Sequence, residues 1–236
     1  MATDLTDMPD SGKTDKIFKT SITKSELAEL PAEVYSGKIT VIDKEEDVAA
    51  AADILEASPM IGFDTETKPS FHRGERHNVA LMQLSTLDEC FLFRLNNIGL
   101  PDRLKDILEK DGIMKIGVSI HDDFLNLHKN YKFEPRGFLD LQLFVKDFNI
   151  ADNSLSRIYG ILFDKRISKG QRLSNWEAAT LTQHQQEYAA LDALACLNIY
   201  NLLSTQGFDY KHSKYYREFD DPSVQQQPAP QQEENP

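Results

Sequence analysis

The sequence predicts a single α/β domain with a mixed β-sheet flanked by helices. The chain has 236 residues, enough for one substantial hydrophobic core. Short apolar runs typical of strands alternate along the chain with longer helical patterns. Some strands follow each other without a helix between them, whereas helices separate the others. The first arrangement favours antiparallel pairing and the second favours parallel pairing, so we expect both in one sheet.

Apolar runs and turn residues define the expected elements. Strands are predicted at 38–42, 60–67, 78–85, 89–95 and 115–120. Helices are predicted at 45–57, 102–110, 122–131, 139–148 and 155–162, followed by a long last helix that ends near residue 205. This last helix has a capping box at its start, formed by Thr182 and Gln185, and Gly207 as a stop signal.

The two ends of the chain differ in composition from its middle. Residues 1–25 are mostly polar and are predicted to form a flexible arm. Residues 220–236 are rich in proline and glutamine and contain no aromatic residue, so they cannot bury enough surface to offset the entropy of ordering. We expect the folded domain to span residues 26–219.

Composition excludes several classes of protein. The sequence shows no signal peptide and no apolar run long enough to cross a bilayer, and Cys90 and Cys196 lie in apolar stretches typical of buried free thiols. These features predict a cytoplasmic protein with no membrane partner. The net charge of −12 argues against non-specific coating of nucleic acids, although local charge around a site can still be positive.

Two acidic residues end a strand that is predicted to be buried. Asp64 and Glu66 follow the apolar run Met60 to Phe63 and, because side chains alternate along a strand, both point to the same face. Two neighbouring carboxylates are costly in such a place unless a cation neutralises them. Hard oxygen ligands suit Mg²⁺ or Mn²⁺. A solvated loop start is the alternative interpretation of this pair.

Three further candidates come from two other segments. Asp123 begins a helix directly after a buried strand, where an acidic residue is also favoured by the helix dipole, and Asp122 competes with it for the same role. Tyr188 and Asp192 are four residues apart on the last helix and therefore share one face. Taken alone, this pair is better explained as a core tyrosine with an incidental surface aspartate.

Together these segments have the order Asp-x-Glu, Asp and Tyr-x-x-x-Asp, which resembles the DEDD superfamily of 3′–5′ exonucleases, also called DnaQ-like. The neighbouring sequences, residues 79–85 and 173–176, extend the resemblance over about residues 34–203. The chain is similar to the tyrosine-bearing (DEDDy) branch because Glu187 occupies the position of the histidine in the other branch. Family spacing favours Asp123 over Asp122. The resemblance implies a ribonuclease-H-like fold.

The resemblance also implies roles for the five residues. Asp64 would bridge two divalent metal ions, Mg²⁺ or Mn²⁺, Glu66 and Asp192 would complete the first ion, and Asp123 would hold the second. Tyr188 would orient the attacking water, because an unperturbed tyrosine pKa of about 10 makes it a poor base at neutral pH. The implied reaction is phosphodiester hydrolysis from the 3′ end of DNA or RNA, with release of nucleoside 5′-monophosphates.

Substrate contacts are weaker predictions. Two groups of basic residues flank the motifs, one at 68–77 and one at 157–172, and both could be ordinary solvated loops. The side chains singled out for substrate binding are Thr65, Arg166, Lys169, Arg172 and Trp176. Trp176 could stack on a base, but a structural anchor is the preferred interpretation.

Two rival functions stay open at this point: a non-catalytic nucleic-acid-binding module with the same fold, and an enzyme restricted to very short oligonucleotides. The expected partner is a nucleic acid with a single-stranded or frayed 3′ end. The sequence does not specify the oligomeric state, the preferred metal, or a choice between DNA and RNA.

Overall fold

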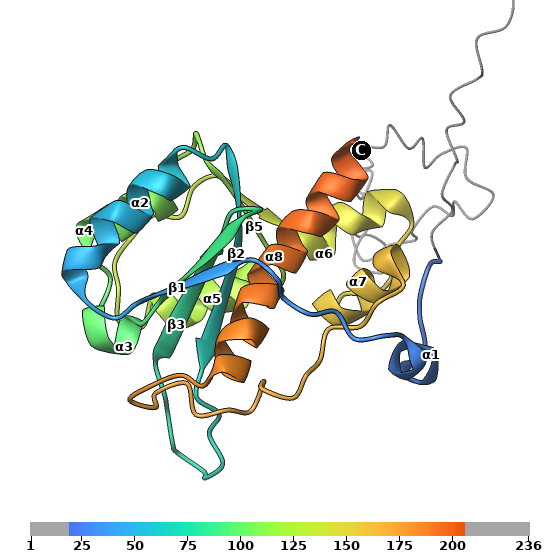
Figure 1. Cartoon of the computed structure of the whole chain (residues 1–236), viewed down its shortest axis with the longest axis horizontal. Coiled ribbons are helices and arrows are strands. Elements are labelled where there is room, and N and C mark those ends of the chain that lie inside the picture. Colours follow the sequence, from blue (N-terminus) through green and yellow to red (C-terminus); the bar gives the residue numbers. More distant parts are fainter. Residues whose placement is uncertain (1–18, 206–236) are drawn as a thin grey trace, which may run out of the picture.

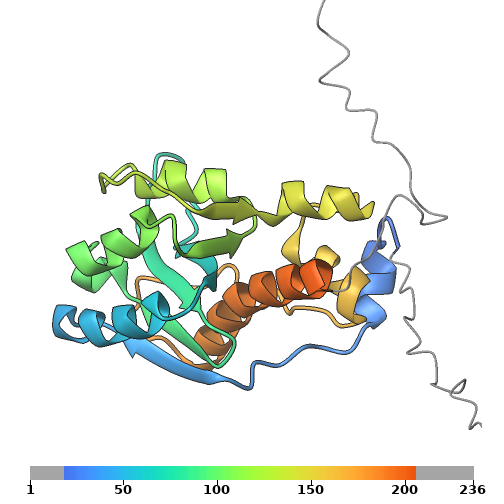
Figure 2. The same ribbon diagram turned by 90° about the horizontal axis from the view of Figure 1, so that it is seen from above.

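The computed structural model describes residues 19–205, which form a six-stranded mixed sheet with helices on both faces (Figures 1 and 2). The predicted α/β class is therefore confirmed. Most of the predicted arm, the end of the predicted domain and the whole Pro/Gln-rich tail lie outside the described residues. No helix within residues 19–205 is long and apolar enough to cross a membrane.

The sheet has the order β1-β4-β3-β2-β5-β6. Its central hairpins, β2 with β3 and β3 with β4, are antiparallel, whereas β1 pairs parallel with β4, and β5 pairs parallel with both β2 and β6. The strand bounds are β1 Lys38–Ile42, β2 Met60–Thr67, β3 Val79–Ser85, β4 Glu89–Phe93, β5 Met114–Gly117 and β6 Phe138–Asp140.

The helices lie between and after these strands. Their bounds are α1 Lys24–Glu29, the 3₁₀ helix η1 Glu45–Asp47, α2 Val48–Glu56, α3 Leu95–Ile98, α4 Asp102–Glu109, α5 Ile120–Leu127, α6 Leu141–Phe144, the 3₁₀ helix η2 Val145–Phe148, α7 Leu155–Phe163 and α8 Gln183–Thr205. The predicted capping box is present: the Gln185 amide NH donates to the Thr182 hydroxyl at 3.3 Å, and the Thr182 NH donates to the Gln185 side chain at 3.0 Å.

Each face of the sheet has its own hydrophobic core. One core joins the sheet to α7 and α8 and includes Leu81, Leu92 and Cys196. The other joins it to α2, α4 and α5 and includes Phe63, Met82 and Phe91. Alternate residues of β2 and β3 thus enter different cores, which explains why every residue of β3 is buried. Both cysteines are free and buried, as expected.

The N-terminal end of the described chain packs against the domain. Ile22 is buried and its NH donates to the Asp152 carboxylate at 2.9 Å. α1 lies against α7 at Gly160, where a β-carbon would approach Leu27 Cδ1 to 2.7 Å. Residues 19–25 therefore differ from the flexible arm that the sequence predicts there, because Ile22 supplies an apolar anchor within a polar segment.

Two predicted elements need correction. The segment 139–148, predicted as one helix, begins with strand β6 and continues as the short helices α6 and η2. A three-residue strand has too few side chains to show a period of two, and its pairing with β5 comes from tertiary structure. The strand predicted at 115–120 ends at Gly117, since Ser119 adopts a left-handed conformation (φ 60°) that starts α5.

Candidate active site

The site forms where α8 crosses the sheet over β2. At Gly62, a β-carbon would lie 1.9 Å from the carbonyl oxygen of Ala193, so only glycine permits this approach of helix and strand. Asp64 and Glu66 follow Gly62 at intervals of two and point to the same face, and Asp192 precedes Ala193 on the helix. The close approach therefore brings the carboxylates of β2 and α8 together.

Three of the predicted acidic residues form one cluster. One carboxylate oxygen from each of Asp64, Glu66 and Asp192 lies within 4.8 Å of the corresponding oxygens of the other two. Glu66 is only 8% exposed and Asp192 only 6% exposed. The two elements that supply the cluster, β2 and α8, are far apart in sequence, so the cluster is a product of the fold.

Asp123 approaches the cluster from the other face of β2. It lies in the first turn of α5, where its carboxylate accepts a hydrogen bond from the Thr65 hydroxyl. Thr65 lies between Asp64 and Glu66 and points to the opposite side of the strand. Thr65, singled out for substrate binding, thus contacts Asp123 in the structure. Asp122, the competing candidate, is exposed.

Asp140 of β6 fixes the start of α5. One oxygen of its carboxylate accepts the Ile120 NH at 3.0 Å, and the other accepts the Gln142 NH at 2.8 Å. The Gln142 side chain donates in turn to the Ser119 hydroxyl at 2.7 Å. Sequence reasoning missed Asp140 and Gln142, because the segment was predicted to be helical. These contacts hold the turn that presents Asp123.

Tyr188 lies beside the acidic cluster, one helical turn before Asp192. Burial, followed by the negative charges of Asp192 and Glu66, raises the pKa of Tyr188 far above its ordinary value. The hydroxyl is therefore neutral at physiological pH. Trp176 packs near the tyrosine ring, with ring centroids 6.1 Å apart, and is completely buried. This burial favours the anchoring interpretation of Trp176 over base stacking.

The acidic residues raise one another's affinity for protons. Burial, and then repulsion from Asp192, raises the pKa of Asp64 well above its ordinary value, and burial likewise raises the pKa of Glu66, Asp123 and Asp192. Such a site favours either proton uptake or binding of a cation. Clustered carboxylate oxygens suit a hard divalent ion such as Mg²⁺ or Mn²⁺, so the residues present fit the expected metal.

The structure divides the basic residues at 157–172 into two groups. Arg157 pairs with Asp152 at 2.8 Å and Lys165 with Glu33 at 3.0 Å, while the Arg166 guanidinium donates to the Leu30 carbonyl at 3.0 Å. These three side chains tie the N-terminal segment and neighbouring loops to the domain.

Lys169 and Arg172 form the other group, and both are exposed. Burial raises the pKa of Glu66 and of Asp192, and the positive charges of Arg172 and Lys169, respectively, counteract part of that rise. Only these two of the predicted basic contacts therefore face the acidic cluster.

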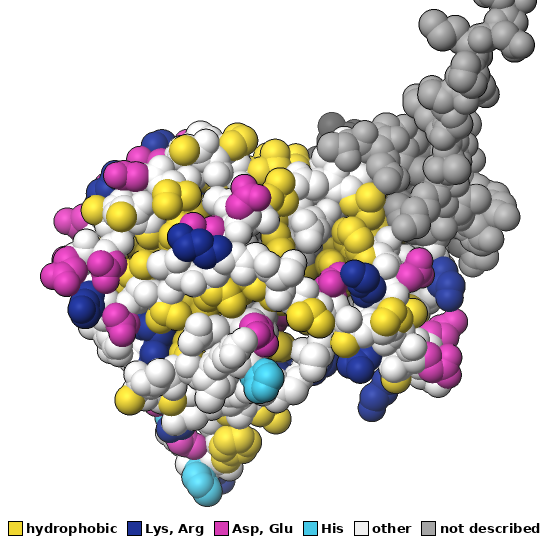
Figure 3. Space-filling view, in the orientation of Figure 1, with side chains coloured by type: hydrophobic (Ala, Val, Ile, Leu, Met, Phe, Trp, Pro, Cys, Tyr) yellow, Lys and Arg dark blue, Asp and Glu magenta, His cyan; other side chains and the backbone are white. Residues whose placement is uncertain are grey.

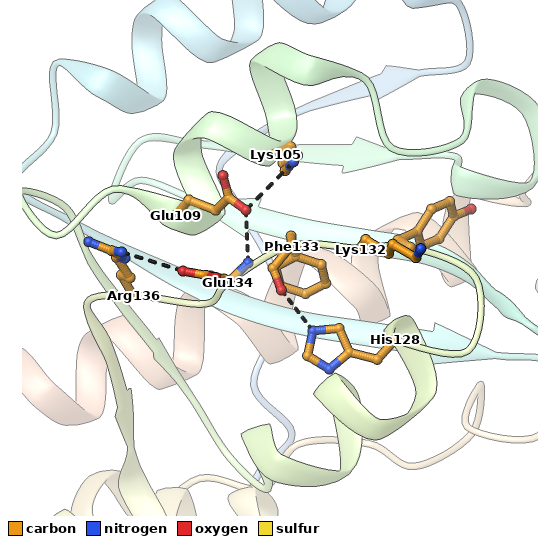
Figure 4. A pocket seen from close by; sticks show the side chains of 8 residues that line it. Lys105, Glu109, His128, Lys132, Phe133, Glu134 and Arg136 are labelled. Atoms are coloured by element: carbon orange, nitrogen blue, oxygen red, sulfur yellow. Dashed lines mark hydrogen bonds and ion pairs between the residues drawn. The ribbon is translucent and has the colours of Figure 1, made fainter.

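Two cavities differ in their relation to the cluster. A cavity of about 200 Å³ lies beside Tyr188, with Tyr35, Gln171 and Leu191 in its walls. A larger one of about 650 Å³ lies between α4 and the loop after α5 (Figure 4) and includes none of the predicted site residues. Charged groups in this cavity already have partners. The Glu109 carboxylate accepts the backbone NH of Glu134 at 2.8 Å, and Arg136 pairs with the Glu134 carboxylate at 3.4 Å. The acidic cluster is therefore the candidate active site.

Comparisons with known proteins show the family. A family model described as 3′–5′ exonuclease matches residues 39–207. The chain is 34% identical over 169 residues to exonuclease 3′–5′ domain-containing protein 2 of Drosophila melanogaster, covering 70% of this chain and 28% of that protein. It is 32% identical over 200 residues to the bifunctional 3′–5′ exonuclease/ATP-dependent helicase WRN of Mus musculus, covering 80% of this chain and 14% of that protein. The chain thus spans less than a third of either relative.

Solved structures show the same fold. The EXO domain of Aedes aegypti Nibbler superposes with a TM-score of 0.66 at 24% identity, covering 74% of this chain and 92% of that one. Escherichia coli RNase D superposes with a TM-score of 0.65 at 22% identity, covering 72% of this chain and 45% of that one. The expected ribonuclease-H-like architecture is thereby confirmed. With a family model that matches most of its length, the chain belongs to the 3′–5′ exonuclease family.

Proposed function

We propose that this protein is a metal-dependent exonuclease of the tyrosine-bearing branch, which removes nucleoside 5′-monophosphates from the 3′ end of DNA or RNA by a two-metal mechanism. The observation that supports this most directly is the cluster of Asp64, Glu66 and Asp192 beside Tyr188, within a chain of the 3′–5′ exonuclease family. The substrate is a single-stranded or frayed 3′ end.

The carboxylates have separate tasks in this proposal. Asp64, Glu66 and Asp192 would hold one divalent ion, and Asp123 together with Asp64 would hold the second. When bound, Mg²⁺ or Mn²⁺ supplies Lewis-acid stabilisation of the reacting oxygens and lowers the pKa of the attacking water. The Thr65 hydroxyl donates to the Asp123 carboxylate and so holds it against β2. Without a cation, the raised pKa values of these acids favour protonation, which removes ligands as the pH falls.

Tyr188 and the basic pair act on the reactants. The neutral Tyr188 hydroxyl can donate one hydrogen bond and accept another, which suits the positioning of a water molecule for attack on phosphorus. Lys169 and Arg172 offset the negative charge that otherwise repels a phosphodiester. The cavity beside Tyr188 offers a surface, with Tyr35 and Leu191, on which the terminal nucleoside can rest.

An end-labelled oligonucleotide assay tests the proposal. Wild-type protein should release mononucleotides from single-stranded DNA or RNA, or from recessed duplexes, with Mg²⁺ or Mn²⁺ and not with EDTA. Asp64→Asn should abolish release while preserving the circular dichroism spectrum. Asp47→Asn is the matched control, since Asp47 is an exposed acid in η1. Wild-type rates for Asp64→Asn would overturn the metal assignment. Metal-independent binding without hydrolysis by the wild type would instead indicate a non-catalytic module.

A further inference from the structure

The loop that joins β2 to β3, residues 68–78, starts two residues after Glu66 and projects from the sheet (Figure 1). We call it the hairpin loop. Because β2 supplies two acids of the cluster, its end fixes where the loop emerges relative to the site. The segment that leads into α8 lies on the same side of the molecule (Figure 1). Any substrate strand that reaches the cluster from this side passes close to both.

His77 ties the hairpin loop to this second segment. Its Nε2 lies 2.8 Å from a Glu75 carboxylate oxygen, and its Nδ1 lies 2.9 Å from a Glu177 carboxylate oxygen. Both ring nitrogens therefore face a carboxylate, one from the hairpin loop and one from the second segment. The side chain is 11% exposed. Lys68 reinforces the link from the start of the loop, 3.5 Å from the other Glu177 oxygen.

Glu75 also shapes the loop itself. Its second oxygen accepts the backbone NH groups of Phe71 and His72 at 3.1 and 3.3 Å. Glu75 is the only acidic residue of the hairpin loop, and these contacts with the backbone and His77 occupy both of its oxygens. The basic side chains of the loop thus have no free acid of their own loop to neutralise them.

Arg73 and Arg76 are exposed, and neither side chain has a hydrogen bond or ion pair with residues 19–205. Phe71 is 70% exposed. Figure 3 shows histidine and hydrophobic side chains at the projecting end of the molecule, with parts of basic and acidic side chains beside them. In a protein of net charge −12, this is a local concentration of positive charge with an aromatic ring. Such a combination suits a phosphate backbone with stacked bases.

Lys169 and Arg172 extend the positive charge to the acidic cluster from the other side. They lie in the segment that ends at Trp176, next to Glu177. The contact between His77 and Glu177 therefore joins the hairpin loop to the segment that carries Lys169 and Arg172. A strand held by both would cross the rim of the site with its 3′ end at the carboxylates.

We propose that the hairpin loop is a binding arm for the phosphate backbone of the substrate strand, at nucleotides upstream of the 3′ end. Arg73 and Arg76 bind phosphates, Phe71 stacks on a base, and the contact of His77 with Glu75 and Glu177 holds the arm in place. This inference rests on the proposed function. It adds a length requirement: the arm acts only on strands long enough to reach it.

The first test compares substrates of two lengths. In Arg73→Gln/Arg76→Gln, KM for a 12-nucleotide strand should rise about 10-fold with kcat unchanged, and the slope of log KM against log salt concentration should fall by about 1 to 2. KM and kcat for a dinucleotide should not change. Lys44→Gln/Arg136→Gln, with two exposed cations elsewhere, is the matched control. An unchanged KM for the longer strand, or an equal rise for both, would overturn the proposal.

Two more variants separate binding from structure. Arg73→Lys/Arg76→Lys should restore most of the affinity, because phosphate contacts depend on charge, whereas a purely structural role would not be rescued. His77→Phe should raise KM for the 12-nucleotide strand alone and leave the melting temperature nearly unchanged. Wild-type affinity in His77→Phe would show that the His77 contacts do not position the arm.

An equilibrium binding measurement tests the role of the hairpin loop independently of the proposed exonuclease activity. Fluorescence anisotropy of a labelled 12-nucleotide strand in EDTA measures the arm even in a protein that hydrolyses nothing. Weaker binding by Arg73→Gln/Arg76→Gln is the expected result. Equal binding by the wild type and this variant would contradict the proposal, and would indicate a loop that serves another partner, such as an acidic protein.

Discussion

Asp192 is 6% exposed, faces two other carboxylates and still retains a positive neighbour in Lys169. Its folded-state pKa is raised mainly by burial, so the folded protein binds a proton at this site more tightly than the unfolded chain does. The resulting stability is fully present below the ordinary aspartate pKa of about 4, and it is lost as the pH rises through the folded pKa. Without metal, the site therefore destabilises the fold at neutral and alkaline pH.

Asp192→Asn should for this reason melt at a higher temperature than the wild type in EDTA, and by a larger margin at pH 8 than at pH 5. Added Mn²⁺ should raise the melting temperature of the wild type and raise that of the variant less, since a ligand is missing. Differential scanning calorimetry at the two pH values measures both effects. A variant less stable than the wild type at pH 8 without metal would contradict the repulsion argument.

Tyr188→Phe keeps the aromatic ring near Trp176 and removes only the hydroxyl. If the hydroxyl positions the attacking water, kcat should fall by ~10–10³-fold, the range expected for loss of one transition-state hydrogen bond. Mn²⁺ affinity should persist because no ligand is lost. Turnover and Mn²⁺ titration, measured on the same preparation, separate an effect on kcat from an effect on metal binding. Unchanged turnover would assign Tyr188 to the core alone, and loss of Mn²⁺ binding would make it a structural support.

Gln83 presents the opposite case, a polar side chain whose burial has no visible compensation. It is paired with Asp64 across the β2–β3 ladder and is completely buried, and neither amide atom has a hydrogen-bond partner within residues 19–205. Gln83→Met should raise the free energy of unfolding by about 1 kcal/mol, because an unsatisfied amide is replaced by an apolar chain of similar size.

Gln185→Met is the matched control for Gln83→Met. Gln185 is buried too, but its side chain accepts the Thr182 NH and donates to the Asn175 carbonyl, so its loss should destabilise the protein by about 1 kcal/mol. Urea unfolding of both variants gives the comparison. If Gln83→Met destabilised the protein as much as Gln185→Met does, the Gln83 amide would have to make stabilising hydrogen bonds.

At the scale of elements, the crossing of α8 over β2 decides whether the acids meet. Gly62→Ala would place a β-carbon 1.9 Å from the Ala193 carbonyl oxygen and 2.7 Å from its carbon, and both are backbone atoms that can move only with the helix. We expect a loss of about 1–3 kcal/mol in the free energy of unfolding. Since Asp192 moves with Ala193, kcat/KM should fall more than 10-fold.

Gly112→Ala is the control for the crossing, because a β-carbon there meets nothing within 4 Å. It should be neutral or slightly stabilising, through the lower entropy of its unfolded chain. Thermal unfolding and turnover of both alanine variants test the argument. Wild-type activity in Gly62→Ala would show that the helix can shift without separating the ligands.

At the scale of the whole molecule, the hairpin loop and the segment before α8 lie on the same side of the sheet (Figure 1). The proposed reaction needs a free 3′ terminus at the carboxylates, so a 3′-phosphate should slow hydrolysis strongly and a circular single strand should not be cut. Linear and circular forms of one DNA sequence, incubated with Mg²⁺ and separated on a gel, provide the measurement. Efficient cutting of circles would indicate an endonuclease.

The sequence by itself determined what depends on local pattern. The apolar runs within 38–42 and 60–67, the capping box at Thr182 and the spacing of Tyr188 and Asp192 predict elements that the structure contains at those positions. Such features follow from neighbours within a few residues, because side-chain alternation and helix capping are local effects. The five candidate residues came from the same kind of pattern, joined by family resemblance.

Tertiary structure decided what depends on contacts between distant segments. Only the fold shows that Asp140 caps α5, that Thr65 holds Asp123, and that Arg166 contacts a backbone carbonyl while Arg172 faces the acids. It also made residues 138–140 a strand, through pairing with β5. The partners of a side chain across the fold depend on packing, which no local pattern encodes. The role of each charged group depends on which opposite charge the fold brings near it.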